Sequence, residues 1–224
     1  KGKELLSKSY HYILSGAMVA IYGQVDKLML KHMIDQTSVG YYSIAVSISN
    51  MWVFVLTAII DSMYPTILQL HKEDRSQFER KNRQLYGIVF YVSIGVSTIL
   101  TIFGRYAILI LYGEEYLPSV GALSVVTWYT AFSYLGVARN AWLVCENKQK
   151  YLKYTYATAA IMNVILNSIM IPLWGAMGAG LASLITQMFT SIGLPAMIPD
   201  MRPNVKLMLQ AIALKDWLPE KQKK

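Results

Sequence analysis

The sequence predicts an all-α membrane protein, a polytopic bundle of six transmembrane helices. Six apolar stretches each exceed the roughly 20 residues that a helix needs to cross about 30 Å of hydrocarbon. The composition agrees, because 54% hydrophobic and only 15% charged residues are too apolar for one soluble core in a chain of 224 residues. The six stretches cover residues 10–30, 39–68, 85–112, 120–144, 154–173 and 176–198.

Most of the basic residues lie in every second connection between these stretches, and therefore on one side of the predicted membrane. If the N-terminal end is cytoplasmic, only Lys31 is clearly outside; Lys27 and Arg105 lie toward outer helix ends and Arg139 lies within the fourth stretch. This positive-inside pattern predicts that both chain ends are cytoplasmic, and it explains the net charge of +8 without a nucleic-acid partner. The basic residues on the cytoplasmic side are Lys1, Lys3, Lys8, Lys72, Arg75, Arg80, Lys81, Arg83, Lys148, Lys150, Lys153, Arg202, Lys206, Lys215, Lys221, Lys223 and Lys224.

Two segments outside the apolar stretches are predicted to be cytoplasmic. Residues 71–84 form a charged connector whose acids and bases alternate at helical spacing, which is typical of surface ion pairs. We therefore divide the chain into a six-helix transmembrane domain, residues 1–198, and a tail, residues 199–224. The tail is expected to form an amphipathic helix on the inner membrane surface, where its lysines favour anionic lipid. Its apolar residues at helical spacing are Leu207, Met208, Ala211 and Leu214.

Polar side chains form a stripe along each of the first two apolar stretches. Steps of three, four and seven residues place the members of a stripe on one face of an α-helix. Hydrogen-bonding groups are costly against lipid, so we expect these faces to line an aqueous groove or a helix interface. The stripes are His11, Ser15, Tyr22 and Asp26 in the first stretch, and Ser43, Ser47, Asn50, Thr57 and Asp61 in the second.

Three charged residues within the apolar stretches need partners. Asp26 requires a basic partner, a proton or a cation, and Lys27 points about 100° away from it on the same helix. Two interpretations remain open. One is ion coupling or substrate contact; the other is a structural role, either in a pair with a base on another helix or as a side chain that snorkels to the outer boundary. Asp61 and Arg139 both lie toward cytoplasmic helix ends, where they either pair as an inner gate or reach water separately.

The fifth and sixth stretches carry further polar groups. Asn163 and Asn167 are four residues apart, and the sixth stretch has a polar flank that contacts either substrate or a neighbouring helix. Small residues around Gly175, Gly178 and Gly180 predict close helix packing. The polar flank consists of Ser183, Thr186, Gln187 and Thr190.

Aromatic residues lie at the ends of the apolar stretches. Tyr86 and Trp142 fall at inner boundaries, while Tyr42 and Tyr112 fall at outer ones. Such positions are typical of interfacial anchoring belts, and we assign these residues no role in substrate binding.

The order of several short motifs resembles a known transporter family. Residues 24–67 carry Asp26 followed by Leu28 and Met29, then a Val-Gly-Tyr-Tyr run at residues 39–42, and Pro65 near the end. These features are similar to the seventh and eighth helices of Wzx-type polysaccharide flippases, within the multidrug, oligosaccharidyl-lipid and polysaccharide exporter superfamily. The later matches are Tyr112, Gly113, Glu115 and Tyr116 in an outer loop, and Pro172, Gly175, Gly178, Ala179 and Ala182 in the penultimate loop and following helix.

The resemblance implies that this chain is the C-terminal lobe of a two-lobe transporter. The chain starts at Lys1 with no initiator Met, so we expect a missing N-terminal lobe to form the other wall of a central cavity. The implied substrate is an oligosaccharide on a polyprenyl diphosphate, as for O-antigen or capsule repeat units, flipped by alternating access in a bacterial cytoplasmic membrane. Other implied partners are the lipid bilayer and proteins of polysaccharide assembly.

The same resemblance suggests roles for individual residues. A diphosphate needs basic groups, so Arg139 and Lys27 are the candidate headgroup contacts. Asp26 is the candidate coupling acid for H+ or Na+, and no other cofactor is expected. The remaining candidate substrate contacts are Asn50, Tyr22, Asn163 and Asn167.

Two other functions would also place polar groups within membrane-spanning helices. A cation-coupled multidrug antiporter of the same superfamily would use acidic and aromatic cavity residues, for which Asp26, Asp61, Tyr22 and Trp52 are available. A membrane-embedded polysaccharide polymerase or ligase would need a sizeable outer loop, and the predicted outer loops are short. No catalytic triad, nucleotide-binding loop or metal-ligand motif occurs in the sequence, and Cys145 is its one cysteine.

Overall fold

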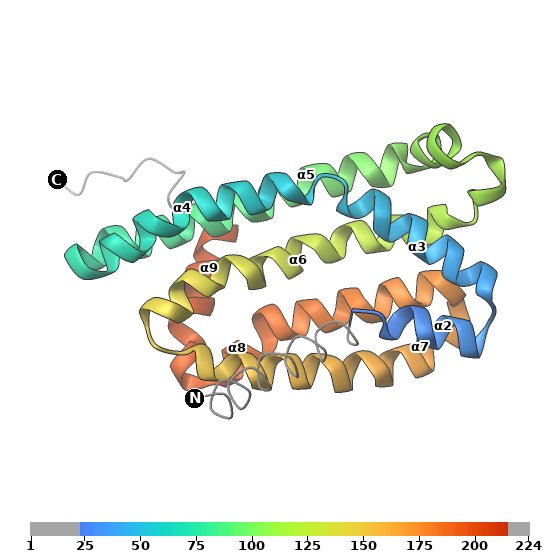
Figure 1. Ribbon diagram of the computed structural model, residues 1–224. Coiled ribbons are helices and arrows are strands. Elements are labelled where there is room, and N and C mark those ends of the chain that lie inside the picture. Colours follow the sequence, from blue (N-terminus) through green and yellow to red (C-terminus); the bar gives the residue numbers. More distant parts are fainter. Residues whose placement is uncertain (1–22, 215–224) are drawn as a thin grey trace, which may run out of the picture.

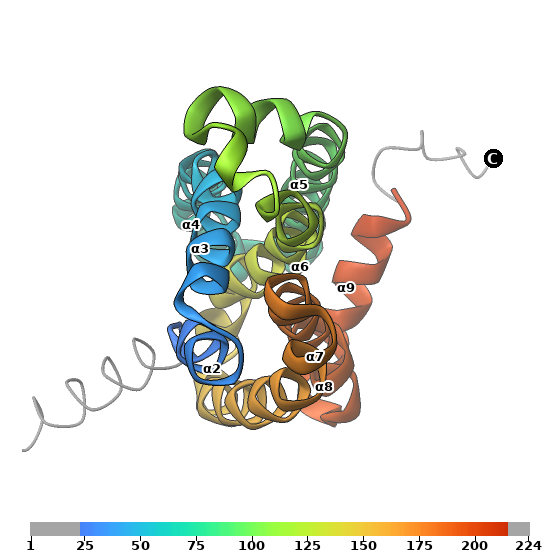
Figure 2. The ribbon, with the colours of Figure 1, turned by 90° about the vertical axis from the view of Figure 1, so that its right-hand side faces the viewer.

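The computed structural model describes residues 23–214, and all secondary structure in this part of the chain is helical (Figure 1). This confirms the predicted all-α bundle. Viewed end-on, α6 lies at the centre and contacts α3, α4, α5 and α7 (Figure 2). The main helices are α2 (Val25–Met33), α3 (Gln36–Asn50), α4 (Val53–Glu73), α5 (Arg75–Tyr112), α6 (Ser119–Cys145), α7 (Leu152–Met188), α8 (Leu194–Met197) and α9 (Arg202–Ile212).

Four helical stretches in the described part of the chain are long and apolar enough to cross a membrane. They are Val53–Glu73, Arg75–Tyr112, Ser119–Cys145 and Gln149–Met197. The last stretch has 49 residues and contains a reversal of direction at Gly175, so it supplies both the fifth and the sixth predicted crossings. Most of the first predicted crossing, up to residue 22, lies outside the described residues, as do residues 215–224 of the tail.

The second predicted crossing is not one continuous helix, which corrects the expectation for residues 39–68. It breaks between α3 and α4, where the Met51 N–H donates to the Ile48 carbonyl three residues back instead of four. Just before the break, the buried Ser49 hydroxyl forms a hydrogen bond with the Thr130 hydroxyl of α6, 3.2 Å away. The break divides the predicted polar stripe, so Thr57 and Asp61 do not continue the helical face that carries Asn50.

Most of the charged connector forms the first turns of helix α5. The Asp74 carboxylate accepts hydrogen bonds from the backbone N–H groups of Ser76 and Gln77, which satisfies two donors at the helix start. The helix ends at Gly113, whose φ of 90° suits glycine. Its 38 residues correspond to about 57 Å at roughly 1.5 Å per residue, more than the hydrocarbon thickness. The charged segment from Arg75 onward is therefore the first part of a helix that is longer than one bilayer crossing requires.

Helix α7 folds back on itself as a hairpin at Gly175, where φ is 53° and ψ is −129°, and its second limb continues through the π-helical segment Phe189–Gly193 into α8. The two limbs approach closely at Gly178, because a Cβ atom there would lie 2.1 Å from the Met170 carbonyl oxygen. The prediction of close packing through small residues is thus confirmed at this position. The hairpin brings Asn163 and Asn167 on its first limb beside Ser183 on its second.

Helix α9 crosses the bundle and packs on α5 (Figure 1). The Asn204 side-chain amide donates to the Tyr86 hydroxyl at 2.6 Å, and the Tyr91 hydroxyl donates to the Ile212 carbonyl at 2.6 Å. Tyr86 is fully buried and Trp142 is 2% exposed, so both belong to the core and not to the boundary belt predicted for them. Of the predicted tail, Arg202–Ile212 is helical and Leu214 lies beyond the helix end. The position of this tail on a membrane surface stays a prediction.

Candidate functional site

A polar cavity opens between α2, α3, α6 and the α7 hairpin. Its volume is about 480 Å³. Two of these elements, α6 and α7, belong to apolar stretches of span length, where polar linings are costly and usually serve a pathway or a binding site. Its polar lining residues are Gln24, Asp26, Lys27, Tyr42, Asn50, Tyr129, Thr130, Ser133, Tyr134, Asn163 and Ser183.

Asp26, in the first turn of α2, accepts hydrogen bonds from three other helical segments. The Tyr42 hydroxyl on α3 donates to Oδ2 at 2.6 Å, and the Ser183 hydroxyl donates to the same oxygen at 2.8 Å. The Asn167 side-chain amide donates to Oδ1 at 2.6 Å. These contacts join α2 to α3 and to both limbs of the hairpin, so the carboxylate lies where three elements converge.

A second layer of polar side chains orients this cluster. The Asn163 amide donates to the Ser183 hydroxyl at 3.1 Å, and the Asn163 carbonyl oxygen accepts from the Asn167 amide at 3.1 Å. Asn163 and Asn167 are both buried. Because each group holds the next one, a change at any member alters how the others face Asp26.

The Asp26 cluster has the chemistry of a small-cation or proton site. Among the described residues no basic side chain pairs with Asp26, so the structural ion pair considered from the sequence is not formed there. The buried Asn167 Oδ1 has no hydrogen-bond partner. Hard cations such as Na+ prefer carboxylate, carbonyl and hydroxyl oxygens, all of which are present within this cluster. The described residues include no cluster of His, Cys, Asp and Glu suited to a transition metal.

The predicted substrate contacts divide between two hollows. Lys27, Asn50 and Asn163 line the polar cavity, while Asn167 lies behind it as a partner of Asp26. Tyr22 lies outside the described residues. Arg139 lines a separate hollow of about 110 Å³, which shares Ser133 and Val137 with the cavity.

Arg139 is only 3% exposed and donates from Nη1 to the Ser191 carbonyl oxygen at 3.0 Å. Its Nε has no hydrogen-bond partner. Asp61 is exposed on α4, and no ion pair joins the two residues in the described structure. The predicted gate pair is therefore not formed in this conformation, because the guanidinium points to the α7 hairpin and the carboxylate faces outward.

Sequence reasoning missed the contributions of Tyr42 and of α6 to the cavity. Tyr42 was interpreted as an interfacial anchor, whereas it is 5% exposed and bonds Asp26. The α6 face was not singled out, although its spacing of three and four residues is a helical stripe. That stripe consists of Val126, Tyr129, Thr130, Ser133, Tyr134 and Val137.

Comparison with known proteins places this chain in a family. The sequence model described as "Polysaccharide biosynthesis protein" matches residues 1–121. A relative from Haloferax volcanii, described as "Probable flippase AglR", is 28% identical over 182 residues, covering 76% of this chain and 37% of the relative. The chain thus spans little more than a third of that protein's length. No solved structure matches. With its span-length apolar helices, the chain is a multi-pass membrane protein that belongs to the polysaccharide biosynthesis protein family.

Proposed function

We propose that this chain forms one wall of the translocation pathway of a flippase that moves a lipid-linked oligosaccharide across a membrane. The observation that carries this proposal is the polar cavity of about 480 Å³ among apolar helices, with Asp26 held at its edge. The family and the similarity to a probable flippase support the same class. Because the chain spans 37% of that relative, the opposite wall comes from the rest of a longer transporter.

The proposed substrate is an oligosaccharide on a polyprenyl diphosphate, such as an O-antigen or capsule repeat unit, flipped in a bacterial cytoplasmic membrane. Its sugar would contact Asn50 and the tyrosines of α6, which offer hydroxyl and amide groups to a neutral polar ligand. Its diphosphate would contact Lys27, and Arg139 once the hollow around that residue opens. Alternating access then requires the α7 hairpin to move relative to α6.

We further propose that Asp26 couples transport to H+ or Na+. The three hydrogen bonds to this carboxylate come from α3 and both hairpin limbs, so its neutralisation would loosen the contacts between these elements. A bound ion would thereby favour one of the two positions that the hairpin takes relative to α6 during alternating access. Coupling requires such a difference in ion affinity between the two states.

A complementation assay tests the function. The full-length gene product is expressed in a bacterium that lacks its own polysaccharide flippase, and surface glycan and lipid-linked intermediates are measured. Restored surface glycan supports the proposal. Unrestored glycan together with resistance to cationic drugs favours a cation-coupled antiporter, for which the acid and the tyrosines of the cavity are suitable.

The headgroup contact is tested with Lys27→Gln. We expect the apparent affinity for lipid-linked substrate to fall roughly 10- to 150-fold, because one charge-assisted hydrogen bond is worth about 1.5–3 kcal/mol. The matched control is Lys31→Gln, which also removes one positive charge from α2. Lys31 lies one helical turn after Lys27, is exposed and does not line the cavity. Equal loss in both variants, measured by transport against substrate concentration, would contradict a contact at Lys27.

A further inference from the structure

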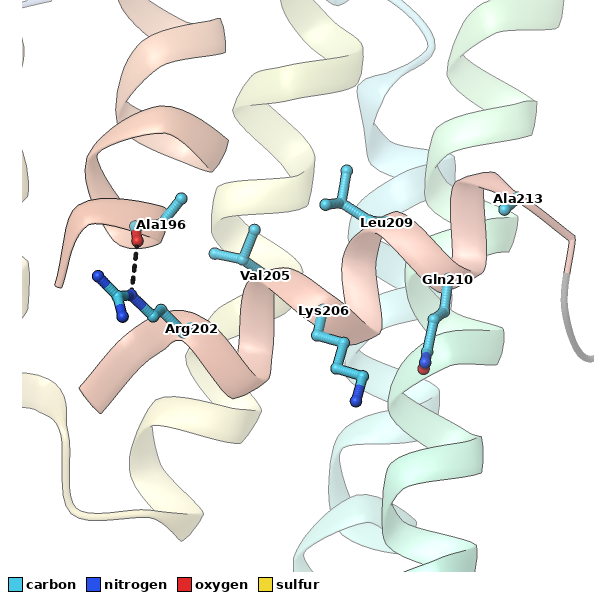
Figure 3. A pocket seen from close by; sticks show the side chains of 7 residues that line it. All are labelled: Ala196, Arg202, Val205, Lys206, Leu209, Gln210 and Ala213. Carbon is cyan, nitrogen blue, oxygen red and sulfur yellow. Dashed lines mark hydrogen bonds between the residues drawn. The ribbon is translucent and has the colours of Figure 1, made fainter. Parts of the chain in front are cut away.

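Helix α9 separates two hollows at the end of the bundle where α4 and α5 meet. One hollow, about 430 Å³ in volume, is lined by apolar residues of α9 together with Ala196 (Figure 3). The other, about 620 Å³, is lined by charged residues of α5. Arg202, Lys206 and Gln210 line both hollows, so these side chains stand at the boundary between an apolar surface and a basic one.

The free surface of α9 is amphipathic. Its packed face carries Leu207, Met208 and Ala211, which are buried in the core. On the other side Leu209 remains 51% exposed, and Met197 at the end of α8 remains 68% exposed. Figure 3 shows Val205 and Leu209 on one side of α9, with Lys206 and Gln210 extending from the opposite side. A helix of this kind suits a membrane interface, with apolar groups toward the acyl chains and basic groups toward the headgroups.

The basic hollow offers positive charge to an anion at Arg202 and Lys206. Arg75, which also lines it, is paired with Glu79 at 3.1 Å and with Glu146. The Arg202 Nε donates to the Ala196 carbonyl at 3.1 Å, which orients its guanidinium at the boundary of the two hollows (Figure 3). Lys206 is exposed and forms no ion pair within residues 23–214. The basic residues of this hollow are Arg75, Arg83, Arg202 and Lys206.

The depth of α9 along the bundle agrees with the level of lipid headgroups. It contacts α5 at Tyr86 and Tyr91, near the cytoplasmic end of the third predicted crossing. The charged start of α5, from Arg75 onward, continues past this level. In the predicted orientation, the apolar hollow would face the acyl region and the basic hollow would face the aqueous side.

We propose that α9 binds an anionic phospholipid of the cytoplasmic leaflet, with its phosphate between Arg202 and Lys206 and an acyl chain along the exposed side chain of Leu209. Each basic residue near a membrane surface adds attraction for anionic headgroups. A free phosphate would use the charges and leave the apolar hollow in water, whereas a lipid fills both hollows. The site is separate from the polar cavity and does not depend on the transported substrate.

The test is native mass spectrometry of the full-length, delipidated protein titrated with phosphatidylglycerol. Phosphatidylcholine with identical acyl chains and soluble glycerol phosphate are titrated alongside it. We expect phosphatidylglycerol to bind tightest and the Arg202→Gln/Lys206→Gln variant to bind it roughly 10- to 30-fold more weakly, the effect of two charges near a headgroup. Leu209→Gln is expected to weaken phosphatidylglycerol binding and leave glycerol phosphate binding unchanged.

The matched control is Lys150→Gln/Lys153→Gln, which removes two exposed charges from the same end of the bundle outside both hollows. We expect this control to bind phosphatidylglycerol within about threefold of the unmodified protein. Equal weakening in both double variants would overturn the site in favour of general surface charge. Equal binding of phosphatidylcholine, or glycerol phosphate binding as tightly as the lipid, would also overturn it. Thermal unfolding of each variant in detergent verifies that the α9 substitutions leave the fold intact.

Discussion

Replacing Asp26 by asparagine is expected to stop coupled transport while the protein still inserts and folds. The two side chains are nearly equal in size, and the Tyr42 and Ser183 hydroxyls can rotate to accept from the new amide. The negative charge that would hold a cation or a proton is nevertheless gone. We expect the transport rate to fall by up to roughly 150-fold, which corresponds to a coupling free energy of about 3 kcal/mol.

The matched control for this change is Asp61→Asn. Asp61 is exposed on α4, makes no ion pair in the described structure and does not line the polar cavity. Transport in the control should stay within about twofold of the unmodified protein, since surface substitutions of this kind usually have small effects. Transport by Asp26→Asn at the unmodified rate, across a range of Na+ concentrations and pH values, would refute the coupling role.

Ion binding can be measured separately from transport. A ligand that binds only the folded state stabilises it by about 2.7 kcal/mol at 100 times its Kd. If Na+ is the coupling ion, its addition should raise the unfolding temperature of the unmodified protein and leave that of Asp26→Asn unchanged. If the temperature responds to pH alone and that response disappears in Asp26→Asn, the proton is the coupling ion.

The largest expected effect on folding comes from Gly178→Ala. A Cβ atom at this position would lie 2.1 Å from the Met170 carbonyl oxygen and 2.6 Å from its carbon, both in the backbone of the opposite limb. Backbone cannot move aside as a flexible side chain can, so the two limbs must separate. We expect the free energy of unfolding to fall by more than about 3 kcal/mol, above the usual range for an overpacked core.

The separation of the limbs would also dismantle the Asp26 cluster, because Asn163 and Asn167 lie on one limb and Ser183 on the other. The control is Gly95→Ala within α5, where no atom lies within 4 Å of the added Cβ. This change should stabilise the protein by about 0.5–1 kcal/mol, since alanine is the better helix former. Thermal unfolding in detergent compares the two variants, and a Gly178→Ala protein as stable as the unmodified one would contradict the hairpin geometry.

Several site residues could be recognised before the fold was known. Asp26 stood out because an acid within an apolar stretch is costly, and Asn163, Asn167 and Ser183 stood out as polar groups in apolar surroundings. The convergence of all four on one carboxylate could not be predicted. It depends on how closely the hairpin limbs approach and on the rotation of α2 toward them, and neither is encoded in the spacing of a single helix.

The incorrect interpretations have a common cause. Tyr42 and Trp142 lie near the ends of apolar stretches, so their positions along the sequence matched interfacial anchors, yet both side chains are buried. The position of a residue along a helix can be counted from the sequence. Whether its side chain faces the core or the surface depends on which neighbouring helices pack against that side. The break at Met51 was missed for the same reason, because a tether between Ser49 and Thr130 leaves no trace in hydropathy.

The helical class, the positions of most of the membrane-length segments and the alternation of their turns between the two ends of the bundle could be predicted from the sequence. These follow from apolar length and charge, which are local and additive along the chain. The packing of the helices, by contrast, sets which polar groups meet at Asp26, that Arg139 bonds Ser191 instead of Asp61, and that α9 divides two hollows. Those outcomes depend on close packing between helices, where a shift of about 1 Å makes or breaks a hydrogen bond, and hydropathy carries no information at that scale.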